Sequence, residues 1–161
     1  MSSLEWCIAA CGEGLDSAKW DTLPTTRIAV NEATHRMPDY QYFSAIDRIE
    51  YADYPGARDA IRLITTLAIR MYDREGKPYD LGDVYHAIDY DAALGSLDLA
   101  VMYALRQGAT RVVLVGADGM GTKARGMTAP IHRSTYPHWC ARVIKQCEKI
   151  CRDADCQLIL L

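Results

Sequence analysis

Two glycines near the start of the chain stand where a backbone could approach a phosphate group. Gly12 and Gly14 follow the apolar run WCIAAC and precede a stretch with a helical pattern. Glycine has no Cβ, so the backbone can come close to a ligand, and a following helix start offers free N–H groups. The local sequence is GEGLDS, so Ser17 stands at the third position of a GxGxxG pattern and Glu13 adds a carboxylate. The segment therefore predicts an anion-binding loop with an incomplete dinucleotide pattern.

Polar residues and glycines also follow three other apolar runs. They are Asn31 and Glu32 after RIAV, Asp47 after YFSAI, and Gly116 and Asp118 after RVVLV. In an open parallel sheet, ligands bind outside the carboxyl ends of the strands, near the point where the strand order reverses. Glu32 lies twenty residues after Gly12, which is the place of the ribose-binding acid in nicotinamide dehydrogenases, so an NAD site stays open. The simpler alternative is that strand ends need polar, turn-forming residues.

The spacing of apolar residues predicts the elements that position these side chains. Strands are expected at 6–11, 27–30, 42–46, 111–115 and 156–161, with weaker candidates at 61–66 and 84–88. Helices are expected at 96–107, with Ser96 as N-cap and Gly108 as the stop, and at 136–154, with short helical turns at 16–23 and 31–37. Strands that alternate with helices predict an α/β class: one Rossmann-like domain over 1–161, with a doubly wound, mainly parallel sheet flanked by helices.

Composition narrows the classes of function. The 161 residues are 50% hydrophobic and 24% charged with a net charge of −3, which excludes a mostly disordered chain and disfavours a nucleic-acid partner. No apolar run approaches the roughly 18 residues of a membrane span, so no membrane association is expected. The first residues have no positively charged region before the apolar run, so we expect a cytoplasmic protein without a signal peptide.

Three of the six cysteines, which lie in the last helical segment, are interpreted as small core residues. None forms a CxxC pair, and a reducing compartment argues against disulfides. Cys140, Cys147 and Cys151 repeat on one helix face. A metal or redox role remains the alternative.

Three blocks of sequence, in order, resemble one superfamily. They are IAACGEGLD, TRIAVNEATHRMPDYQYFSAID and GSLDLAVMYALRQGATRVVLVGAD, which together cover about two-thirds of the chain. The superfamily contains bacterial lipooligosaccharide sialyltransferases, motility-associated flagellin glycosyltransferases and archaeal 6-hydroxymethylpterin pyrophosphokinase-like proteins. Small versions also occur in phage and prophage genomes, and this chain is similar to those.

The resemblance assigns roles to single residues. Gly12 and Gly14 lie in the segment that matches the phosphate loop, Asn31 matches a nucleotide-contacting Asn, and Ser96 matches a serine that meets nucleotide oxygens. Gly116 and Asp118 match the G-x-D at a strand end, and Asp118 could hold a divalent cation such as Mg²⁺ if the chemistry is pyrophosphoryl transfer. His138, beside the start of the last helix, and then His132 occupy the stretch that holds the general-base histidine of the sialyltransferases. As an alternative, each histidine is an ordinary surface residue.

The leading hypothesis is a glycosyltransferase-like enzyme that uses a nucleotide-activated donor. A non-catalytic nucleotide-binding module is the second hypothesis, because Cys11, Glu13 and Leu97 depart from the superfamily pattern. A pterin-type pyrophosphokinase that uses ATP and Mg²⁺ is the third. The expected partner is a small-molecule nucleotide ligand, and the apolar last strand leaves a homo-oligomer open.

Overall fold

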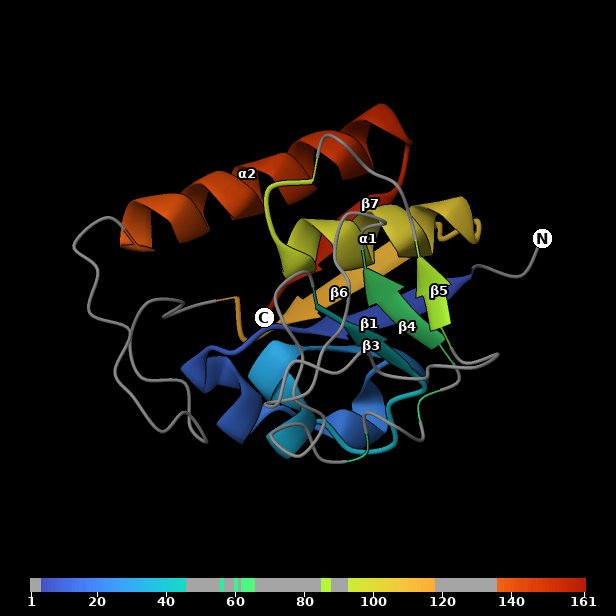
Figure 1. The fold of residues 1–161 in the computed structure, drawn as a ribbon, viewed down its shortest axis with the longest axis vertical. Coiled ribbons are helices and arrows are strands. Elements are labelled where there is room, and N and C mark those ends of the chain that lie inside the picture. Colours follow the sequence, from blue (N-terminus) through green and yellow to red (C-terminus); the bar gives the residue numbers. More distant parts are fainter. Residues whose placement is uncertain are drawn as a thin grey trace, which may run out of the picture.

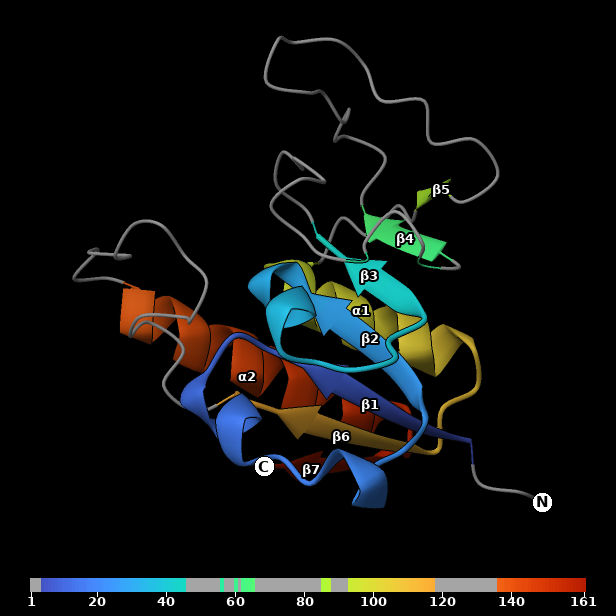
Figure 2. The same ribbon diagram turned by 90° about the horizontal axis from the view of Figure 1, so that it is seen from below.

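A single sheet of seven parallel strands forms the centre of the protein. The computed structural model describes residues 4–45, 56, 60, 62–65, 85–87, 93–117 and 136–161. The strands are β1 (Glu5–Ala9), β2 (Thr26–Val30), β3 (Tyr42–Ser44), β4 (Arg62–Thr65), β5 (Tyr85–Ala87), β6 (Arg111–Val115) and β7 (Gln157–Leu160). Their order is β5-β4-β3-β2-β1-β6-β7, and every neighbouring pair is parallel (Figures 1 and 2). This confirms the predicted α/β, Rossmann-like class.

The order of the strands contains one reversal. From β1 the chain adds β2, β3, β4 and β5 on one side, and then returns to place β6 and β7 on the other side of β1. The chain that leaves the carboxyl end of β1 therefore leads to strands on one side of β1, and the chain that leaves β6 leads to β7 on the other side. This is the topological switch point, where open α/β sheets bind their ligands.

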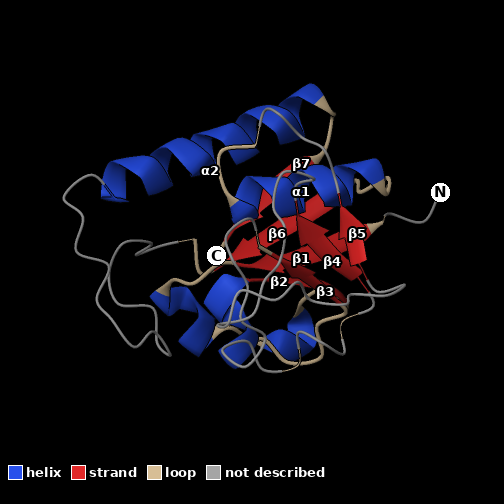
Figure 3. Cartoon of the chain, in the orientation of Figure 1, coloured by secondary structure: helices blue, strands red, loops and turns tan. Residues whose placement is uncertain are grey.

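One face of the sheet is covered by the two α-helices, α1 (Ser96–Arg106) and α2 (Tyr136–Asp153) (Figure 3). Alternate residues of β1, such as Trp6 and Ile8, point to this face and pack with Leu99 and Val143. Because α1 packs against both the sheet and α2, eight of its eleven residues are buried. Trp6 and Tyr103 also form an aromatic cluster with Tyr42, with ring centroids 5.1–6.0 Å apart.

The helix α1 begins at Ser96, within the predicted range, but its capping residue differs from the predicted one. Gly95 is the N-cap, and Ser96 is the first helical residue, so the expectation that Ser96 caps the helix is wrong. The reason is the carboxylate of Asp98, which accepts hydrogen bonds from the backbone N–H groups of Leu94 and Gly95 at 2.7 Å each. The helix ends as predicted, with Gly108 just beyond it at φ +86°.

Short 3₁₀ turns cover part of the opposite face. They are η1 (Glu13–Ser17), η2 (Trp20–Thr22) and η3 (Asn31–His35), so the helical turns expected at 16–23 and 31–37 are present as 3₁₀ structure. The side chain of Arg27 holds this layer together, because its guanidinium donates to the backbone oxygens of Trp20, Pro24 and Pro38 at 2.6–3.1 Å. A buried cation is tolerated here because each of its nitrogens has a partner.

Cys147 and Cys151 are core side chains, as expected, and the side chain of Cys140 lies outside the described part. Cys7, Cys147, Cys151 and Cys156 are buried free thiols. Burial raises the pKa of Cys7 and of Cys151 to about 12, so neither thiol ionises near neutral pH. Among the described helices, none is long and apolar enough to cross a membrane.

Candidate functional site at the carboxyl ends of the strands

The ends of β1 and β6 are joined by close backbone contacts. The N–H of Gly12 donates to the carbonyl of Gly116 at 2.7 Å, and the N–H of Ala10 donates to Val115 at 2.8 Å. Gly116 has φ +70°, and a Cβ there would lie 2.8 Å from Cγ of Leu15 and 3.0 Å from the carbonyl oxygen of Ala10. Only glycine fits this position, because other residues would be both strained and crowded. Gly12 and Gly116, both predicted as site residues, therefore contact each other at the switch point.

The ends of β2 and β3 meet the start of α1. Nδ2 of Asn31 lies 3.4 Å from Oγ of Ser96, and the hydroxyl of Ser44 donates to the carbonyl of Ser96 at 2.8 Å. Asn31 has φ +48°, a conformation that asparagine tolerates better than most residues. Residues 65 positions apart are thus neighbours. Ser44 is an addition that the sequence analysis missed, because nothing local marks it as more than a strand residue.

Cys11 lies between these two groups. Its thiol donates to the carbonyl of Val30 at 3.3 Å and contacts Oε2 of Glu32 at 3.5 Å. Cys11 is bonded to Gly12, and Glu32 is bonded to Asn31, so the glycine pair and the Asn31–Ser96 pair lie along one rim of the sheet. Burial, and then the carboxylate of Glu32, raise the pKa of Cys11 to about 12. The thiol is therefore a neutral hydrogen-bond donor and not a nucleophile at neutral pH.

A cation that the sequence analysis did not single out fixes the loop after β1. The guanidinium of Arg36 donates to the carbonyls of Cys11 at 2.9 Å and Gly12 at 3.2 Å, and lies 3.5 Å from the carboxylate of Asp16. The Arg36 side chain is only 11% exposed. It places a positive charge beside the Gly12 loop. Its hydrogen bonds also occupy two carbonyl oxygens that would otherwise repel an anion.

The start of α1 offers less to an anion than its sequence suggests. Asp98 is fully buried and takes the N–H groups of Leu94 and Gly95 for itself. Burial raises the pKa of this carboxyl, while the backbone N–H groups act in the opposite direction. Ser96, the first helical residue, is itself buried, and its hydroxyl lies 3.4 Å from the amide of Asn31.

The loop after β1 also differs from a complete dinucleotide pattern. Gly12 caps a 3₁₀ turn of five residues, and the carbonyl of Gly14 accepts a hydrogen bond from the hydroxyl of Ser17 at 3.3 Å. The expected helix start behind Gly14 is therefore a single short turn. An anion bound here would meet the loop backbone and not the end of a long helix.

The predicted catalytic and metal-binding residues are not described by the structure at side-chain level. Asp118 and His132 lie outside the described residues, as does Asp47. The backbone places His138 in the first turn of α2, and its side chain is outside the described part. The general base therefore stays a prediction, as does the binding of Mg²⁺ by Asp118 in the pyrophosphokinase alternative.

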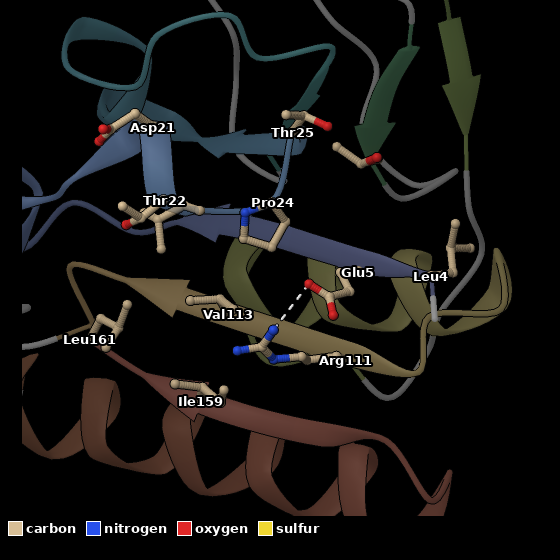
Figure 4. A pocket seen from close by; sticks show the side chains of 12 residues that line it. Leu4, Glu5, Asp21, Thr22, Pro24, Thr25, Arg111, Val113, Ile159 and Leu161 are labelled. Carbon is tan, nitrogen blue, oxygen red and sulfur yellow. Dashed lines mark hydrogen bonds and ion pairs between the residues drawn. The ribbon is translucent and has the colours of Figure 1, made fainter. Parts of the chain in front are cut away.

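A separate cavity lies on the face of the sheet that carries the 3₁₀ turns (Figure 4). It measures about 600 Å³ and lies between the segment 21–26 and the strands β6 and β7. Two charged side chains from the strands line it, and they form an ion pair: the guanidinium of Arg111 lies 3.0 Å from the carboxylate of Glu5. Its lining includes none of the five described residues predicted for the site, namely Gly12, Gly14, Asn31, Ser96 and Gly116. The rim and this cavity are therefore two different places on the molecule.

Comparisons with protein-family models, with curated proteins and with solved structures find no match to this chain.

Proposed function

We propose that this protein binds a nucleotide or a nucleotide-activated sugar at the carboxyl rim of its sheet. The observation that carries the proposal is the meeting of Gly12 with Gly116 at the β1/β6 switch point, beside the contact between Asn31 and Ser96. The switch point is where the general rule for open α/β sheets places a ligand. The side chains found there are of the kinds that recognise nucleotides.

Each part of a nucleotide has a chemical counterpart on the rim. The glycine pair lets a phosphate come close to the backbone, and Arg36 supplies a positive charge behind that loop. The amide of Asn31 and the hydroxyl of Ser96 can exchange their 3.4 Å contact for hydrogen bonds to a base or phosphate oxygen. The carboxylate of Glu32 can accept from a ribose hydroxyl.

Transfer chemistry forms the second part of the proposal, and the resemblance to sialyltransferases supports it. In the proposed reaction, His138 accepts the proton of an acceptor hydroxyl while that oxygen attacks the anomeric carbon of the sugar. The nucleotide leaves with the electron pair of the glycosidic bond. Without a competent base, the same rim would bind the nucleotide and leave it intact.

The contact between Cys11 and Glu32 favours a second candidate, a nicotinamide dinucleotide. It places an acid at the end of β2 next to the end of β1, where dinucleotide-binding folds hold the ribose. The incomplete glycine pattern and the short 3₁₀ turn η1 argue for a smaller ligand. Direct comparison of ligands separates the two.

Calorimetry and thermal-shift measurements with CMP, UDP, CMP- and UDP-sugars, ATP with and without Mg²⁺, and NAD test the binding. We expect one nucleotide class to raise the melting temperature. Ser96→Ala should weaken its binding about tenfold, since one lost hydrogen bond costs about 1–1.5 kcal/mol. Thr110→Ala is the control. This exposed hydroxyl lies just before the amino end of β6, whereas the proposed site lies at the carboxyl ends of the strands. Absence of any shift, or equal affinity in both variants, would overturn the proposal.

Turnover is tested separately from binding. His138→Ala should retain nucleotide affinity and lose hydrolysis or transfer of the sugar, whereas His35→Ala should retain both. Full activity of His138→Ala excludes the assigned base. Binding without turnover in the wild type identifies a non-catalytic module, and stabilisation by ATP only with Mg²⁺ identifies the pyrophosphokinase.

A further inference from the structure

We infer that two copies of this chain associate through β7, which pairs with its own copy across a two-fold axis and joins the two sheets. The inference is independent of the proposed nucleotide site, since β7 carries none of its residues. The sequence of β7 does not match the position of this strand in the sheet. The strand reads QLIL and is followed by Leu161, so it has no charge and no proline, as in an interior strand. In the described sheet, however, it is the edge beyond β6 (Figure 2).

The backbone of β7 leaves its outer edge ready for pairing. Towards β6, the N–H groups of Gln157 and Leu161 donate to Thr110 and Leu114 at 3.0 and 2.9 Å. Because backbone groups alternate along a strand, those of Leu158 and Leu160 point away from β6. No described strand pairs with them. Natural edges of this kind usually carry lysine, proline or a bulge to prevent association, and β7 carries none of these.

After Gln157, the side chains of β7 and the following Leu161 are apolar on both faces. Leu158 and Leu160 line a hollow of about 220 Å³ beside α2, and Ile159 and Leu161 line the larger cavity on the other face. Leu160 and Leu161 are 45% and 56% exposed, two of the three large hydrophobic residues exposed among the described ones. An interface core of this composition is typical of homodimers.

The geometry of a strand edge determines how two copies would meet. Antiparallel pairing of identical edges requires a two-fold axis perpendicular to the sheet, here passing between the two copies of Ile159. Leu158 of one copy then faces Leu160 of the other, and the two pairs exchange four backbone hydrogen bonds. Rotation about this axis does not turn the sheet over, so both copies of α2 lie on the same side of the joined sheet.

Charges beside the edge suit a second copy of this chain. Glu148 and Arg152 of α2 line the smaller hollow together with Leu158 and Leu160. The two-fold axis reverses the direction of α2, so the Glu148 end of one helix lies towards the Arg152 end of the other. Opposite charges therefore meet across the apolar strip, and a surface complementary to itself is what a two-fold interface needs.

The experiment measures the mass of the chain by light scattering and by sedimentation over a concentration series. We expect twice the 18.0 kDa of one chain for the wild type. Leu160→Lys should weaken the dimer by about 100-fold or more, because a charge enters the interface twice. Leu4→Lys is the matched control, since Leu4 is similarly exposed at 40% and lies before β1. Circular dichroism and melting temperatures confirm that each variant is folded.

Charge exchange tests the register of the two helices. Arg152→Glu should weaken the dimer about tenfold, and the double exchange Glu148→Arg with Arg152→Glu should restore it to within about threefold. A monomeric wild type at every concentration overturns the inference. A dimer that survives Leu160→Lys, or one that Leu4→Lys disrupts equally, also overturns it, because another surface would then be responsible.

Discussion

Replacement of Gly116 by alanine tests the packing of the rim most directly. The residue has φ +70°, and a Cβ would lie 2.8 Å from Cγ of Leu15, 3.0 Å from the oxygen of Ala10 and 3.2 Å from that of Gly12. The left-handed backbone alone costs an L-residue about 1 kcal/mol, and overpacking adds about 1–3 kcal/mol. We therefore expect Gly116→Ala to lose about 3 kcal/mol of unfolding free energy, which is about 6–12 °C in melting temperature for a domain of this size.

Gly108→Ala separates the two contributions. Gly108 also has a positive φ, +86°, but a Cβ there would meet nothing within 4 Å. This variant should lose only about 1 kcal/mol, or roughly 2–4 °C. Urea unfolding followed by the fluorescence of Trp6, which is buried beside α1, measures both variants. Equal losses in the two variants would refute the claim that the contact with Leu15 and the Gly12 loop restricts this position.

The same pair of variants bears on ligand binding. An alanine at position 116 must displace Leu15, whose Cγ is the nearest atom, and it also crowds the carbonyl of Gly12; both residues belong to the loop that we propose as the phosphate site. Nucleotide affinity should therefore fall in Gly116→Ala and stay unchanged in Gly108→Ala, as measured by calorimetry.

Three further predictions concern the interior. Burial raises the pKa of Asp98 above its ordinary 3.8, so folding favours the protonated carboxyl. Its contribution to stability is complete below about pH 4 and is lost as the pH rises through the raised pKa, and Asp98→Asn should remove this component from urea unfolding measured between about pH 4 and 7. Tyr103→Ala should cost about 3–5 kcal/mol in the same assay because it empties the aromatic cluster, whereas Tyr103→Phe should cost about 1 kcal/mol. With pKa values of about 12, Cys7 and Cys11 should react with a disulfide reagent at pH 8 roughly a thousandfold more slowly in the folded protein than in urea, in a Cys140→Ser background. A fast reaction in the folded protein would contradict their burial.

Local sequence was a good guide to strands and a weaker one to helix ends. The five strong apolar runs and both weaker candidates, including the short β4 and β5, are strands. They could be predicted because a strand buried on both faces needs uninterrupted apolar residues. The N-cap of α1 was misplaced by one residue because Asp98, three residues after Gly95, accepts backbone hydrogen bonds from Leu94 and Gly95.

The candidate site was predicted in part. Because polar residues end each strand, Gly12, Asn31 and Gly116 could be placed at one edge of a parallel sheet without the structure. Arg36 and Ser44 could not be found in this way. Their partners at the rim are distant in sequence, and no local pattern indicates them.

The sequence by itself determined the class of the fold and the edge of the sheet at which its polar residues gather, because hydrophobic periodicity and strand direction are local properties. Only the tertiary structure decided which strands are neighbours, where the order reverses and which strands lie at the edges of the described sheet. Those features depend on contacts between residues far apart in the chain, such as Gly12 with Gly116 and Asn31 with Ser96. The need for glycine at position 116 likewise depends on the folded chain, because it is there that Leu15 packs against this left-handed residue.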